Sequence, residues 1–251
     1  MNSAGQGFHN LLKVIYIVCL LIVDILWAIR YLSSMNGASL RHRIPREEFD
    51  YQTLLDSLSG YSQPRAKITA LLRNNVIVRV KKGLYVFGKE ERRKPLCPEL
   101  LANLIYGPSC VSLEYALAWH ALIPERVDTV TSVTCGRSRA FDTPVGRFVY
   151  RSVPMRAFPV GVDRVEASDG RAFLIATPEK ALADVLVADR RGTILSRKEM
   201  ASYLDESLRI EEGRLKELNR DLLDELATCY RSRKVRLLAS IVGRLKREGQ
   251  G

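Results

Sequence analysis

The chain has 251 residues, of which 47% are hydrophobic and 27% are charged, a balance typical of folded globular proteins. Its 39 Lys and Arg outnumber its 28 Asp and Glu, and the net charge of +11 favours a polyanionic partner, either nucleic acid or an acidic membrane surface. The five cysteines are scattered and the three histidines lie far apart, which argues against a disulfide framework and against a metal site. We therefore expect no metal and no other cofactor.

An apolar run near the N-terminus is the first feature along the chain. Residues 14–23 are all apolar, Asp24 follows, and residues 25–29 are apolar again. A bilayer span needs about 20 mostly apolar residues, so the run is short for one. It could be a signal-anchor helix, a helix that packs on the body, or an upstream extension that the working protein lacks, with translation starting at Met35. We favour the third interpretation, treat residues 1–40 as a separate leader, and expect a cytoplasmic protein without a membrane partner.

The next segment, residues 41–94, has the pattern of a small DNA-binding domain. Helical periodicity covers residues 46–60, and a second helix is expected to open with Ser62 as N-cap and Pro64 in its first turn. Two β-rich runs within residues 76–87, joined by Lys-Lys-Gly, then predict a hairpin. Helix, helix and hairpin in this order predict a winged helix-turn-helix, with the hairpin as the wing.

Positive charge is concentrated in this segment, which holds thirteen Lys and Arg against six Asp and Glu, a net of +7. A helix fits the major groove of DNA, where Arg and Asn side chains can pair with base edges, and wing lysines can neutralise phosphates. The predicted DNA contacts are the outward side chains of the second helix and of the wing: Arg65, Lys67, Thr69, Arg73, Asn74, Arg79, Lys81 and Lys82. Winged helices also serve as protein-interaction modules, and this alternative stays open.

Residues 89–95 are almost all charged and end in proline, which predicts a linker. Residues 95–251 then predict a mixed α/β domain with a helical tail, so the fold class expected for the whole chain is α+β. The expected helices cover residues 98–106, 112–120, 177–186, 196 onward, 213–229 and 232–246. The expected strands cover residues 127–134, 148–153 and 173–176. The last helix is strongly basic, either as a second nucleic-acid contact or as an ordinary solvated face.

Three of these helices carry start signals. Ser112 is the expected N-cap of the helix over residues 112–120, and Thr177 followed by Pro178 opens another. Residues 196–199 read Ser-Arg-Lys-Glu, the pattern of a capping box.

Three segments in order resemble the AbiEi-type antitoxins of abortive-infection, type IV toxin–antitoxin systems. They are RVKKGLYV at residues 79–86, which is similar to the family's wing, CVSLEYALAWHAL at residues 110–122, and ATPEKALAD at residues 176–184. The resemblance spans roughly residues 45–190. The chain departs from the family in its hydrophobic leader and in Ala121, which stands where a glycine is usual.

The resemblance implies a DNA-binding repressor of its own two-gene operon, active in phage defence. Its winged helix would read inverted repeats in double-stranded promoter DNA, and its C-terminal domain would assist cooperative binding and antitoxicity. The toxin would be a nucleotidyltransferase-like protein, countered without a stable complex. The implied DNA contacts are the exposed side chains of the second helix and the wing lysines.

Enzymatic alternatives lack their characteristic residues. No lysine has an acidic residue two positions before it, as a restriction-like nuclease requires, and no D-x-D pair is present to hold magnesium for nucleotidyl transfer. The phosphate-binding G-x-x-x-x-G-K-[ST] loop is also missing. His120 lies on an apolar helix beside Trp119 and is expected to pack or hydrogen-bond rather than act as a base. We expect no enzyme; a membrane-associated regulator stays as a further alternative.

Overall fold

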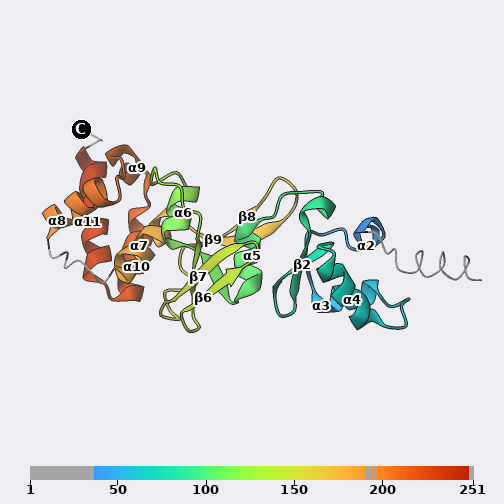
Figure 1. Ribbon diagram of the computed structural model, residues 1–251. Helices are drawn as coiled ribbons and strands as arrows, with labels where there is room; N and C mark the ends of the chain where they lie inside the picture. Colours follow the sequence, from blue (N-terminus) through green and yellow to red (C-terminus); the bar gives the residue numbers. More distant parts are fainter. Residues whose placement is uncertain (1–36, 190–193, 195, 249–251) are drawn as a thin grey trace, which may run out of the picture. The chain divides into compact units, whose positions relative to one another are not determined.

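The computed structural model describes residues 37–189, 194 and 196–248 (Figure 1). The apolar run at residues 14–29 therefore lies outside the described residues. Contacts along the chain define two compact units: one holds the residues up to Val78 together with Tyr85–Lys94, and the other holds Arg79–Leu84 and Pro95–Gly251. The architecture is a mixed α+β fold with a helical C-terminal part. Within the described ranges, no helix is long and apolar enough to cross a membrane.

The N-terminal elements combine short helices with one small sheet. In chain order they are α2 (Gly37–Arg43), β1 (Glu48–Asp50), α3 (Tyr51–Ser57), α4 (Pro64–Arg73), β2 (Ile77–Lys81) and β3 (Leu84–Phe87). The predicted hairpin is confirmed as β2 and β3, and the sheet order is β1-β3-β2. Leu54, Ile68 and Phe87 contribute to one hydrophobic core in which the rings of Phe49 and Phe87 lie 4.9 Å apart.

The single helix expected over residues 46–60 is wrong. Glu48–Asp50 is a strand, because Phe49 packs against β3, and Asp50 then caps α3 by accepting a hydrogen bond from the Thr53 N–H at 2.8 Å. The expected N-cap of α4 is also wrong. Gln63 occupies that position and makes no side-chain cap, while Pro64 lies in the first turn as predicted.

The charged segment expected as a linker is held by the first unit over much of its length. It contains the short helix η1 (Lys89–Glu91), and the Glu47 carboxylate accepts hydrogen bonds from the backbone N–H groups of Arg93 (3.3 Å) and Lys94 (3.0 Å). Glu47 is buried in an ion pair with Arg41, whose guanidinium lies 4.4 Å from the Phe87 ring centroid. A buried ion pair thus ties this segment to β3.

The second unit is built on a six-stranded sheet in the order β6-β7-β5-β4-β9-β8. The strands are β4 (Ser109–Val111), β5 (Val130–Thr134), β6 (Arg139–Thr143), β7 (Gly146–Ser152), β8 (Val162–Glu166) and β9 (Ala172–Ala176). β4 runs antiparallel to β5 and parallel to β9, and β5 runs parallel to β7. The sequence predicted β5, β7 and β9 and missed the other three. β6 and β8 are exposed edge strands with mainly polar residues, and β4 is only three residues long. None of the three therefore shows a clear alternation of apolar and polar residues in the sequence.

Helices pack on this sheet and extend beyond it. They are α5 (Pro98–Ile105), α6 (Leu113–Trp119), α7 (Pro178–Ala188), α8 (Arg197–Ser202), the π-turn η2 (Tyr203–Ser207), α9 (Glu212–Glu217), α10 (Arg220–Tyr230) and α11 (Arg233–Glu248). The last helix, α11, contacts α7, α8, α9 and α10, so the C-terminal helices form one cluster (Figure 1).

Two local start signals are confirmed and one helix prediction fails. Thr177 caps α7, and residues 196–199 form the complete capping box of α8. The helix expected over residues 213–229 is two helices, because Asn219 caps α10 by accepting from the backbone of Asp221 and Leu222. The Asn219 N–H in turn donates to the Glu179 carboxylate at 2.7 Å, a distant contact that no local pattern indicates.

Candidate nucleic-acid interface

The helix α4 divides its residues between a buried and an exposed face. Ile68 and Leu71 enter the core of the first unit. Arg65, Thr69 and Arg73 follow one another at four-residue spacing and are all exposed, so they share the opposite face. Thr69 Oγ1 donates to the Arg65 carbonyl oxygen at 3.1 Å, so both lone pairs of the hydroxyl oxygen can still accept hydrogen bonds. This face offers guanidinium and hydroxyl groups to a partner.

Asn74 is the C-cap of α4 and is exposed, as predicted for a DNA contact. Asn75 beyond it adopts a left-handed φ of 55°, and this allows the chain to turn from α4 into β2. The turn is tight, since a side chain at Gly88 would lie 1.7 Å from the Asn75 carbonyl oxygen. The end of α4 is therefore fixed against the end of the hairpin by backbone contact.

Lys67 does not join the exposed face of α4. It is half-buried, and its Nζ lies 5.5 Å from the Tyr61 ring centroid. Burial lowers the pKa of the Lys67 ammonium. Its aliphatic stem and cation therefore pack on Tyr61, and Lys67 is less exposed than Arg65, Thr69 and Arg73. Its role as a DNA contact stays a prediction.

The hairpin presents its basic residues unequally. Arg79 on β2 is exposed, and so is Lys82 in the turn, where Gly83 adopts a φ of +89° that favours glycine. Lys81 is half-buried and its Nζ donates to the Ile105 carbonyl oxygen of α5. An ammonium held in this way has fewer N–H groups left for a phosphate, so the structure places Lys81 outside the exposed set.

Three exposed arginines of the first unit, Arg43, Arg46 and Arg93, were not predicted as contacts. Arg43 on α2 donates to the Ser57 carbonyl oxygen at 2.7 Å, and Arg46 follows shortly after that helix. Their charges contribute to the net positive charge of the segment. No motif or spacing in the sequence assigns them to a face.

A buried polar network lies in the second unit. Asp184 is its centre: Ser112 Oγ donates to its carboxylate at 2.6 Å, Tyr230 donates through its hydroxyl, and Lys180 Nζ lies 3.5 Å from it. Lys180 Nζ also donates to the Ala157 carbonyl oxygen at 3.0 Å. The side chains of Lys180 and Asp184 are both 0% exposed.

Residues of this network come from two of the segments that resemble AbiEi-type antitoxins. Ser112 comes from the first, and Lys180 and Asp184 come from the second. Ser112 is the N-cap residue of α6 as predicted, but its hydroxyl makes no capping hydrogen bond and donates to Asp184 instead. Tyr230 was missed, because it lies 46 positions from Asp184.

The network lacks the access that a catalytic centre needs. Burial raises the pKa of Asp184, and the Lys180 ammonium with the hydrogen bonds from Ser112 and Tyr230 offsets part of that rise. Burial also raises the pKa of the nearby Cys110 thiol, which keeps the thiol protonated. The network joins the N-cap of α6, the helix α7 and the end of α10.

Two further predicted features fall in the loop after α6. His120 Nε2 lies 2.8 Å from the Ala176 carbonyl oxygen, so the histidine hydrogen-bonds to β9 as the sequence suggested. Ala121 has a left-handed φ of 53°, the conformation that glycine adopts most readily. Ala121 therefore sits at a turn where glycine would be less strained. Within the described part of the chain, no cluster of His, Cys, Asp or Glu could hold a metal ion.

No protein-family model matches the chain, and no curated protein is significantly similar to it.

Proposed function

We propose that the protein is a DNA-binding transcriptional repressor in which the elements from α2 to β3 form a winged helix-turn-helix. The order α2, β1, α3, α4, β2, β3, with a terminal hairpin paired to β1, supports this proposal. In helix-turn-helix domains one helix reads the major groove of DNA. In this proposal α4 is the reading helix and the β2–β3 hairpin is the wing.

The observation that carries the proposal is the exposed face of α4. Arg65 and Arg73 are eight residues apart, so their Cα atoms are separated by about 12 Å along the helix axis. Both can pair with guanine edges or phosphates in one stretch of groove, with Thr69 between them. Lys82, exposed in the hairpin turn, would contact phosphate without reading sequence.

The biological role we propose is that of a cytoplasmic antitoxin in a type IV toxin–antitoxin operon. It would repress its own promoter at inverted repeats and counter a nucleotidyltransferase-like toxin without a stable complex. This part of the proposal rests on the three segments that resemble AbiEi-type antitoxins. Two of those segments supply Ser112, Lys180 and Asp184, whose side chains meet in one buried network.

Titration of the full-length protein on the DNA upstream of its own gene tests the proposal. We expect tight binding that outcompetes random DNA and weakens steeply between two salt concentrations, because phosphate contacts release counterions. Binding without selectivity would contradict the repressor role. No binding at either salt concentration would favour a protein-interaction module instead.

A further inference from the structure

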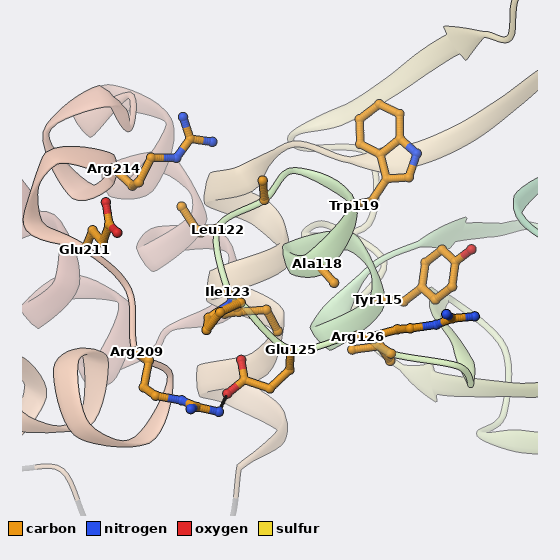
Figure 2. Close-up of a pocket in the computed structure, with 13 residues that line it drawn as sticks. Tyr115, Ala118, Trp119, Leu122, Ile123, Glu125, Arg126, Arg209, Glu211 and Arg214 are labelled. Atoms are coloured by element: carbon orange, nitrogen blue, oxygen red, sulfur yellow. Dashed lines mark hydrogen bonds and ion pairs between the residues drawn. The ribbon is translucent and has the colours of Figure 1, made fainter.

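A cleft in the second unit lies outside the proposed DNA-binding face. It has a volume of about 630 Å³, which is within the range of small-molecule sites. One wall comes from α6 and the loop that follows it, and the other from the segment before and within α9 (Figure 2). Leu122, Ile123 and Val127 give it an apolar lining.

Two aromatic side chains form one end of the cleft. Trp119 is 43% exposed, and its ring makes perpendicular contacts with His120 at 4.8 Å and Phe173 at 6.3 Å. Tyr115 lies one turn earlier on α6, and its hydroxyl donates to Glu99 Oε1 at 2.7 Å. These contacts fix both rings, so an incoming planar group would meet a pre-oriented aromatic surface.

One guanidinium group lies beside this aromatic surface, and two more lie on the opposite wall of the cleft (Figure 2). Arg126 projects on the same side of α6 as Tyr115 and Trp119 (Figure 2), and its side chain is 92% exposed, with Nε 3.2 Å from Asp128. An ion pair at this exposure is weak and easily exchanged for another anion. Arg209 and Arg214 reach the cleft from the opposite wall. Arg209 pairs with Glu125, while Arg214 donates to the His120 carbonyl oxygen at 2.8 Å.

Backbone strain supports a functional cleft. Ala121 and Arg209 line opposite walls and both adopt left-handed conformations, with φ of 53° and 51°. Such conformations are costly for residues other than glycine and cluster at ligand sites. The Arg214 hydrogen bond to His120 joins the two walls next to Ala121. The walls are thus held in a defined arrangement without closing the cleft.

We propose that this cleft binds a nucleotide, with the base stacked on the Trp119 indole and a phosphate paired with the Arg126 guanidinium. An exposed indole is a stacking surface for any base, and a guanidinium matches phosphate oxygens bidentately. The carboxylate of Glu211, which also lines the cleft, can accept hydrogen bonds from ribose hydroxyls or base amines. The nucleotide comes either from a free nucleoside triphosphate or from an unstacked residue of a single strand.

Isothermal titration calorimetry on the full-length protein tests this binding. The ligands are ATP, inorganic triphosphate and a short single-stranded oligonucleotide. We expect ATP or the oligonucleotide to bind, and Trp119→Ala to weaken that binding about tenfold or more, because stacking supplies much of the affinity. Arg126→Gln should weaken it similarly. Arg164→Gln on β8 is the matched control, since Arg164 is also an exposed arginine paired with a carboxylate, and it should change nothing.

The ligand whose binding is weakened by Trp119→Ala shows whether the bound nucleotide is free or part of a single strand. Loss of ATP binding in Trp119→Ala points to a free nucleotide, and loss confined to the oligonucleotide points to a single strand. Inorganic triphosphate binding as tightly as ATP would overturn the proposal, because charge alone would then explain it. The proposal would also be overturned if Trp119→Ala weakened the binding of neither ATP nor the oligonucleotide. Operator binding by the first unit is measured separately, so either proposal can fail alone.

Discussion

In the first unit the guanidinium groups of Arg65 and Arg73 lie exposed along α4, whereas in the second unit Lys180 and Asp184 are buried against each other. Exposed charges contribute little to folding stability, so a basic helix face is better explained by a partner than by the fold. A buried pair costs desolvation and tolerates the loss of neither member. The location of a charge therefore separates residues that are available for recognition from residues that are enclosed by the fold.

The largest expected effect comes from removing one member of the buried pair. Asp184→Ala leaves the Lys180 ammonium buried without its counter-charge, and we expect a loss of about 3–5 kcal/mol in the free energy of unfolding. Urea denaturation monitored by Trp119, which lies in the second unit, measures this loss in a Trp27→Phe background that removes the other tryptophan. Arg164→Ala, which breaks an exposed pair, is the control and should cost less than about 1 kcal/mol. Equal stability of the two variants would contradict the proposed difference between buried and exposed ion pairs.

The second effect is a loss of DNA affinity that leaves the stability of the fold unchanged. Arg73→Ala should weaken binding to the upstream DNA by about 1–3 kcal/mol and relax sequence preference, because one base contact is lost. Its unfolding midpoint should stay unchanged, since the side chain is exposed. Fluorescence anisotropy with specific and random duplexes measures both affinities. Wild-type affinity and selectivity in Arg73→Ala would show that α4 is not the reading helix.

A smaller and less specific effect is expected in the hairpin turn. Lys82→Ala should weaken binding to all duplexes alike and reduce the slope of log affinity against log salt by about one unit. Lys81→Ala is the matched comparison, because its ammonium is held by the Ile105 carbonyl oxygen and should matter less to DNA. A larger change of the salt slope in Lys81→Ala than in Lys82→Ala would contradict the assignment of Lys82 as the lysine that contacts phosphate.

The last effect is a pH dependence that comes from Asp184. Burial raises its folded-state pKa above the ordinary value of 3.8, so the folded chain holds the proton more tightly than the unfolded chain. The resulting stability is fully present below the unfolded-state pKa and is lost as the pH rises through the folded-state pKa. The stability of wild type relative to Asp184→Asn should therefore fall as the pH rises above 3.8. Urea denaturation at several pH values measures this difference in the free energy of unfolding. A difference that increases with pH would contradict the prediction.

Local signals in the sequence predicted local structure well. Thr177 before Pro178 and the capping box at residues 196–199 start helices as expected, because their hydrogen bonds join residues only a few positions apart. The hairpin of β2 and β3 was predicted for the same reason. β1 was missed because Phe49 becomes part of a strand only through its contact with β3.

The candidate sites show the same limit. Arg65, Thr69, Arg73, Asn74, Arg79 and Lys82 are exposed, as the helix and hairpin patterns predicted. Lys67 and Lys81 are not, since each finds a partner that spacing does not reveal, the Tyr61 ring and the Ile105 carbonyl oxygen. The cleft beside Trp119 was not predicted at all, because its walls are about ninety residues apart in the chain and meet only in the folded second unit.

Hydrogen–deuterium exchange of the full-length protein, with and without its upstream DNA, tests the central claim most directly. The claim is that the exposed face of α4 and the hairpin turn bind DNA. The account predicts slower exchange in peptides that cover residues 64–74 and 79–84 when specific DNA is present, and no slowing there with a random duplex at elevated salt. Protection confined to the second unit, with residues 64–74 unchanged, would contradict it.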